Sequence, residues 1–165
     1  MMNFIEWLSE NKRGTYVGLL FNDESVKFLE SFIKKHKIPN PVPSNKLHVT
    51  LLYSRKYLPT FKARESIENI EVQPFKFNVW NTNGENSSTS RCLVLNFKSH
   101  ELVNLHKKYM DDYQATFDYP EYNPHVTLSY NIKDFDVSDL QVPHHKLILN
   151  HEYKELLNLN WASKL

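Results

Sequence analysis

The stretch Leu47-His48-Val49-Thr50-Leu51-Leu52-Tyr53-Ser54 decides the fold, because it recurs in the second half of the chain as Pro124-His125-Val126-Thr127-Leu128-Ser129-Tyr130-Asn131. The two copies share the pattern His-Val-Thr-Leu-x-Tyr. Both are rich in β-branched and aromatic residues and alternate polar with apolar side chains, which is typical of a strand with one buried face. We therefore interpret the pattern as an internal repeat of two strands.

Alternation along a strand sorts the side chains of each copy onto two faces. In the first copy the polar face carries Lys46, His48 and Thr50, and the apolar face carries Leu47, Val49, Leu51 and Tyr53. In the second copy the polar face carries Asn123, His125, Thr127 and Ser129, and the apolar face carries Val126, Leu128 and Tyr130. Each strand thus presents an imidazole and a hydroxyl, about 7 Å apart, on one side. The apolar sides are expected to form the core.

If the two strands face one another across a groove, their histidines and threonines suit phosphodiester cleavage without a metal. A neutral imidazole can take a proton from an attacking hydroxyl or water, and a protonated one can give a proton to the leaving oxygen. The threonine hydroxyls can donate hydrogen bonds to the phosphate oxygens, where charge accumulates in the transition state. The alternative is a pair of ordinary strands with histidines at a sheet surface, but duplication of the same polar pair has no packing reason.

Two His-x-Thr motifs separated by about half a domain resemble the two-histidine (2H) phosphoesterase superfamily, which includes the LigT-type RNA phosphodiesterases and cyclic-nucleotide phosphodiesterases. The resemblance implies an α+β fold with two pseudo-twofold-related lobes of antiparallel sheet and helices packed outside. The central groove between the lobes would carry the two His-x-Thr strands. We expect residues 1–165 to form a single domain of this kind.

Composition limits the classes of partner. With 20 Lys and Arg against 19 Asp and Glu, the net charge is +1, so the chain lacks the basic field that duplex nucleic acid favours. Cys92 is the single cysteine, which excludes an internal disulfide framework and indicates a reducing cytoplasm. We expect neither a signal peptide nor a membrane span. The expected location is cytoplasmic, in the host cell if a phage encodes the protein.

The remaining pattern predicts strands and helices in a regular order. Strands are expected at 14–21, 71–80, 92–97 and 146–153, helices at 23–37 and 99–114, and a short N-terminal helix at 3–11. The prolines at 39, 41 and 43 predict an extended linker that could form one wall of the groove. Residues 82–91 predict a hairpin loop. The separation of His100 and His106 is not metal-ligand spacing on a helix, so both are expected at the surface.

Within the superfamily, the chain most resembles the phage anti-CBASS phosphodiesterases, which degrade the cyclic oligonucleotide signals of a bacterial immune system. Tyr16 lies in the predicted strand ahead of the first motif, and Glu155 and Trp161 lie near the C-terminus, as in that family. The resemblance implies catalytic roles for His48, Thr50, His125 and Thr127 and substrate contacts for Tyr16, Glu155 and Trp161. Glu152 is a rival for the acidic role. From pattern alone, Tyr16 could equally be a half-exposed sheet residue, and Trp161 could simply seal the core.

The resemblance also implies a mechanism. A ribose 2′-hydroxyl, deprotonated by one histidine, attacks the adjacent 3′-5′ phosphodiester of a cyclic di- or trinucleotide such as cyclic GMP-AMP, and the other histidine protonates the 5′-oxygen. Which histidine is the base stays open. Neither a cofactor, nor a metal, nor an obligate protein partner is implied.

Other interpretations use the same residues. A LigT-like enzyme acting on RNA 2′,3′-cyclic phosphate ends would need the same four motif residues, although the near-neutral charge disfavours long RNA. A binding module without catalysis would tolerate loss of a motif histidine, and both are present. Zinc binding through His144, His145 and His151 is disfavoured, because adjacent histidines on a strand point to opposite faces. The basic residues Arg55, Lys56, Lys62 and Arg64 predict a solvated loop, or alternatively phosphate ligands at the mouth of the groove.

Overall fold

The computed structural model describes residues 3–5, 13–83 and 89–158. Its elements along the chain are β1 (Thr15–Phe21), α2 (Asp23–Lys35), the short 3-10 helix η1 (Ser44–Lys46), β2 (His48–Ser54), β3 (Ile70–Asn83), β4 (Thr89–Lys98), α3 (His100–Tyr113), β5 (His125–Ser129) and β6 (Leu147–Leu156). The predicted α+β class and the predicted order of these strands and helices are confirmed. Most of the N-terminal helix expected at 3–11 lies outside the described residues.

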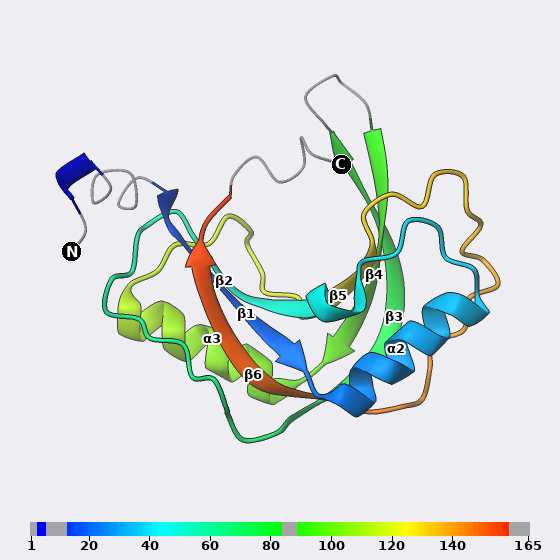
Figure 1. Ribbon diagram of the computed structural model, residues 1–165, viewed down its shortest axis with the longest axis horizontal. Helices are drawn as coiled ribbons and strands as arrows, with labels where there is room; N and C mark the ends of the chain where they lie inside the picture. Colours follow the sequence, from blue (N-terminus) through cyan, green and yellow to red (C-terminus); the bar gives the residue numbers. More distant parts are fainter. Residues whose placement is uncertain (1–2, 6–12, 84–88, 159–165) are drawn as a thin grey trace.

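The six strands form one closed antiparallel barrel in the order β1-β2-β5-β4-β3-β6, with the two helices outside it (Figure 1). The two motif strands, β2 and β5, are therefore neighbours in one sheet and pair at Val49 and Val126. The expectation that they face one another across a groove between two sheets was wrong. Alternation fixes which face a side chain occupies, but it does not say which strand lies beside which.

The number of residues that separates His48 from His125 also separates other equivalent positions, and it relates the two halves of the barrel. The helix N-caps Asn22 and Ser99 have this spacing, and each accepts a hydrogen bond from the backbone three residues on. The pair Val49–Val126, where the motif strands meet, has it too. The halves are β6-β1-β2 and β5-β4-β3, and this arrangement gives the sheet an approximate internal twofold.

The two helices are exchanged between the halves. Helix α3 precedes β5 in the chain, yet His106 donates from Nδ1 to the Leu51 carbonyl of β2 (2.7 Å). Helix α2 precedes β2, yet Phe32 stacks on Phe77 of β3 (5.7 Å between ring centroids). The prediction that His106 lies at the surface was wrong, because this helix face packs on β2; His100 is exposed as predicted.

A β-bulge interrupts each motif strand at the same place. The β1–β2 register passes from Val17–Leu52 to Gly18–Thr50 and skips Leu51. The β4–β5 register passes from Leu93–Ser129 to Val94–Thr127 and skips Leu128, which is the repeat equivalent of Leu51. An extra residue reverses the alternation beyond it. Side chains that follow the bulge therefore change faces.

The main core lies between the helices and the strand face opposite the motif histidines. Val17 and Leu19 of β1, Val49 and Leu51 of β2 and Val126 of β5 are all fully buried there. Leu29 of α2 and Leu102 of α3 are fully buried as well. The histidine-bearing face is left for a cavity. No helix of the described residues is long and apolar enough to cross a membrane.

Candidate active site

Both motif pairs line one cavity of about 700 Å³. His48 and Thr50 enter it from β2, and His125 and Thr127 enter it from β5. Its volume lies within the range of small-molecule and cofactor sites. The structure thus brings the four predicted motif residues together, as neighbours on one sheet face.

The two histidines are held in the same way. Each Nδ1–H donates a hydrogen bond of 2.8 Å to the carbonyl two residues earlier, Lys46 for His48 and Asn123 for His125. A carbonyl can only accept, so Nδ1 carries a hydrogen and the neutral ring keeps its lone pair on Nε2. Each ring therefore offers Nε2 for proton transfer.

The electrostatic surroundings of the two rings differ. Burial lowers the pKa of both His48 and His125, and the backbone hydrogen bonds oppose this. The charge of Glu155 also raises the pKa of His48, whereas the charge of His48 further lowers that of His125. Trp80 makes an edge-on contact with His125, with 4.5 Å between ring centroids. His48 thus has a carboxylate as its electrostatic neighbour, and His125 has an indole against its ring.

The hydroxyl groups of Tyr16 and Thr50 lie 2.6 Å apart and share a hydrogen bond. Burial raises the pKa of Tyr16 well above its ordinary value, so its hydroxyl stays protonated. When Tyr16 donates to Thr50, the threonine hydrogen becomes available to a ligand in the cavity. Tyr16, predicted to contact substrate, lines this cavity with its ring centroid 5.9 Å from that of His48.

The bulges place two further tyrosines on the histidine face. Tyr53 and Tyr130 follow the skipped residues Leu51 and Leu128, and both line the cavity. Strict alternation assigned them to the apolar face, and that prediction was wrong. The repeat shows that both copies share this tyrosine, but it does not show on which face the tyrosine lies.

Glu155 and Glu152 point to opposite sides of β6. Glu155 lines the cavity beside Tyr16, its partner in the β1–β6 register. Glu152 is only 1% exposed and accepts hydrogen bonds from Arg64 and Tyr109 on the other side. Of the two acidic candidates, Glu155 is therefore the one in reach of a ligand. Trp161 lies outside the described residues.

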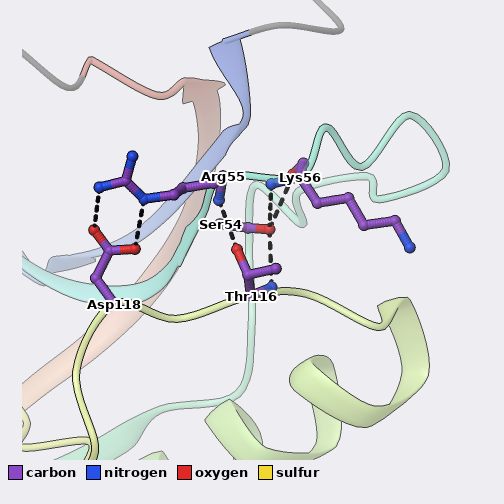
Figure 2. Close-up of polar contacts among 5 residues, drawn as sticks. All are labelled: Ser54, Arg55, Lys56, Thr116 and Asp118. Carbon is purple, nitrogen blue, oxygen red and sulfur yellow. Dashed lines mark hydrogen bonds and ion pairs between the residues drawn. The ribbon is translucent and has the colours of Figure 1, made fainter.

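The basic residues after the first motif do not line the cavity. Arg55 instead makes two hydrogen bonds of 2.9 Å to the Asp118 carboxylate (Figure 2). Beside it, Ser54 Oγ accepts from the Thr116 backbone (3.1 Å), and Thr116 Oγ1 accepts from the Arg55 backbone (2.8 Å). These contacts tie the end of β2 to the chain that continues as residues 117 and 119–123, which form one wall of the cavity.

No group of His, Cys, Asp and Glu within residues 3–5, 13–83 and 89–158 is arranged to hold a metal ion. Among the histidines considered for zinc, His145 is stacked on Phe28 at 4.2 Å between ring centroids. This stacking gives His145 a packing role.

The family model described as "Anti-CBASS protein Acb1" matches residues 13–164. The chain belongs to this family. The Acb1 protein of Salmonella phage S16 is 37% identical over 166 residues, covering 100% of this chain and 99% of that protein. The Acb1 protein of Enterobacteria phage T4 is 37% identical over 153 residues, covering 92% of this chain and 93% of that protein. The resemblance to anti-CBASS proteins is thereby confirmed.

Among solved structures, the chain is similar to TT0787 of Thermus thermophilus, with 12% identity and a TM-score of 0.41 over 84% of this chain and 83% of that one. The relation to Acb1 therefore rests on the sequence matches.

Proposed function

We propose that this Acb1 family member is a metal-independent phosphodiesterase that opens the 3′-5′ bonds of cyclic di- and trinucleotides. The relatives are named anti-CBASS proteins, and we propose the same role here, the removal of cyclic oligonucleotide immune signals in the infected cell. One observation supports the chemistry above all. Two histidines, each with Nδ1 bound to a backbone carbonyl, line the same cavity as two threonine hydroxyls.

In the proposed reaction, Nε2 of one neutral histidine takes the proton of a ribose 2′-hydroxyl. The 2′-oxygen then forms a bond to the adjacent phosphorus, and the bond from phosphorus to the 5′-oxygen breaks. The second histidine, protonated, gives its Nε2 proton to that 5′-oxygen. Thr50 and Thr127 donate hydrogen bonds to the non-bridging oxygens. The product is a linear nucleotide with a 2′,3′-cyclic phosphate end, which water can open when the histidines exchange roles.

The cavity also contains the groups that the bases of such a substrate would contact. Tyr16 supplies an aromatic ring next to His48, and stacking of a base on such a ring is worth about 1 to 3 kcal/mol. Glu155 provides an acceptor for base or ribose donors. Trp161 is proposed to stack as well, on the basis of the family resemblance alone.

Mass spectrometry of the reaction products tests the proposal. The protein is incubated with 3′,3′-cyclic GMP-AMP in the presence of EDTA, and in parallel with an RNA that ends in a 2′,3′-cyclic phosphate. We expect ring opening of the dinucleotide despite EDTA. Cleavage of the RNA end alone would reject the immune-signal substrate, and strict dependence on added divalent metal would reject the mechanism.

A 2′-deoxy analogue isolates the nucleophile. A cyclic dinucleotide without the 2′-hydroxyl beside the scissile phosphate should resist cleavage while still binding. Cleavage of this analogue at the normal rate would show that water, rather than ribose, attacks the phosphorus.

A further inference from the structure

A second cavity, of about 620 Å³, meets the first beside His48. Its outer wall comes from the proline-containing linker, including Asn40, Pro41 and Pro43, which was expected to form a groove wall. His48, Tyr130, Tyr153 and Glu155 line both cavities. A ligand that extends from one space into the other must therefore pass these four side chains.

Among the four, Tyr153 alone has no part in the sequence-based interpretation. It lies on β6 directly opposite Gly18 of β1. A Cβ atom added to Gly18 would lie 2.5 Å from both Cζ and the hydroxyl oxygen of Tyr153, a distance that real Cβ contacts do not show. Among the described glycines only Gly14 has a positive φ, so the backbone at Gly18 does not itself require glycine. Glycine is required at this position because the Tyr153 ring occupies the space that a Cβ atom would need.

The ring that crosses Gly18 reaches the motif residues. Its centroid lies 6.1 Å from that of His48 in an edge-on contact, and 6.1 Å from that of Tyr16. The Tyr16 hydroxyl in turn shares a hydrogen bond with Thr50 (2.6 Å). Burial raises the pKa of Tyr153, so its hydroxyl keeps its hydrogen throughout the working range of the histidines.

We propose that Tyr153 is a substrate-binding residue whose hydroxyl donates a hydrogen bond to a non-bridging oxygen of the scissile phosphodiester, where the two cavities meet. Gly18 is the positioning residue that lets the ring cross β1. This inference rests on the proposed function and adds a donor to it. With Thr50 and Tyr16, Tyr153 forms a line of hydroxyl groups along the His48 side of the phosphate. The Tyr153 donor would strengthen as negative charge builds up on the oxygen.

Tyr153→Phe tests the hydroxyl while it keeps the ring. We expect kcat/KM for 3′,3′-cyclic GMP-AMP to fall about 100- to 1,000-fold, as when a single donor to a developing oxyanion is removed, with an unchanged circular dichroism spectrum. Tyr57→Phe is the matched control, because Tyr57 packs under Lys154 and lines neither cavity. A decrease below about twofold in Tyr153→Phe would overturn the proposal.

Phosphorothioate substrates separate a direct contact from a structural role. Sulfur accepts hydrogen bonds weakly, so replacing the contacted oxygen should slow the wild-type protein for one diastereomer. In Tyr153→Phe that contact is already lost, and we expect the slowing for this diastereomer to shrink while the other diastereomer behaves as in wild type. If the phosphorothioate slows the wild-type protein and Tyr153→Phe by the same factor, the direct contact between Tyr153 and that oxygen is overturned.

Gly18→Ala provides an independent test through a double-mutant cycle. In the Tyr153 background the new methyl group must displace the ring, and we expect a loss of kcat/KM comparable to that of Tyr153→Phe. In a Tyr153→Ala background there is no ring to displace, so Gly18→Ala should add little; equal losses in both backgrounds would reject the positioning role. An inactive wild-type protein would overturn the proposed function and this inference together, whereas an active wild type with unaffected variants overturns only the inference.

Discussion

His48 and His125 show how equal side chains acquire unequal properties. Their Nδ1 hydrogen bonds have the same length and the same kind of acceptor, so the backbone holds both rings alike. The difference comes from the neighbours, a carboxylate whose charge acts on His48 and an indole at His125. Acid-base catalysis needs one proton donor and one acceptor at the same pH, and unequal surroundings favour that state.

Removing either imidazole should abolish most of the turnover. We expect His48→Ala and His125→Ala each to lower kcat about 100- to 10,000-fold, because each variant lacks one proton-transfer group. Cleavage of 3′,3′-cyclic GMP-AMP measures the loss, and circular dichroism checks the fold. Losses below tenfold in both variants would remove the histidines from the proposed chemistry.

Glu155→Gln should identify which histidine is the acid. The Glu155 charge raises the pKa of His48, so its removal lowers that pKa. In the pH profile of kcat/KM, the limb controlled by His48 should therefore move to lower pH. A moving alkaline limb makes His48 the acid, and a moving acidic limb makes it the base. Glu101→Gln, at an exposed carboxylate of α3, is the control. If neither limb of the pH profile moves, the Glu155 charge does not act on the pKa of His48.

At the scale of single elements, alternation predicted the histidine faces of β2 and β5 but failed beyond the bulges. Bulges at Leu51 and Leu128 have no sequence signature, because leucine suits a regular strand equally well. The position of each bulge depends on the register with the neighbouring strand, and that register depends on contacts between residues far apart in the chain. The sequence could therefore predict the imidazole–hydroxyl pairs, whereas the positions of Tyr53 and Tyr130 required the folded sheet.

The contacts at the end of β2 allow a test of which polar interactions hold an element in place. Ser54 is fully buried and bonds to Lys56 and Thr116, so we expect Ser54→Ala to lower the free energy of unfolding by about 1 to 3 kcal/mol. The Arg55 side chain is 58% exposed, and Arg55→Ala should cost less than about 1 kcal/mol despite its two hydrogen bonds to Asp118.

Urea unfolding of the two variants measures this difference. The expected order, Ser54→Ala less stable than Arg55→Ala, follows from burial rather than from the charge of the groups. The reverse order would mean that the ion pair to Asp118, visible in Figure 2, holds the cavity wall more strongly than the buried hydroxyl does.

At the scale of the whole molecule, the order of strands and helices was predictable because each element has its own periodicity and caps. Strand adjacency and the exchange of helices were not, since both depend on contacts between the halves. Glu152 shows this well, because its carboxylate on β6 meets Arg64, from the segment between β2 and β3, and Tyr109 from α3, the helix that precedes β5. Such contacts make the stability of each half depend on the other.

Acid should destabilise the whole barrel through its buried histidines. Burial lowers the pKa of His106 in the folded state, so the unfolded chain binds more protons as pH falls below about 6.5. Its contribution to stability is present above that pH and is lost as pH falls toward the lower folded-state pKa. His48 and His125 act in the same direction.

Unfolding in urea between pH 7.5 and 5.5 measures this loss. His106→Asn should reduce the dependence of unfolding free energy on pH, by at most about 1.4 kcal/mol per pH unit for one proton. His100→Asn, at an exposed residue of the same helix, is the matched control. Equal pH dependence in wild type and His106→Asn would exclude His106 as a source.

The internal repeat has a consequence for how a symmetrical ancestor could become a directional catalyst. Two identical halves would give two interchangeable imidazoles, and neither would be committed to giving or taking the proton. Glu155 pairs with Tyr16 of β1, whereas Leu93, which the repeat relates to Tyr16, pairs with Val79 of β3, so an apolar residue stands at the position equivalent to the carboxylate. Unequal neighbours in a duplicated scaffold thus permit a division of labour between former equals.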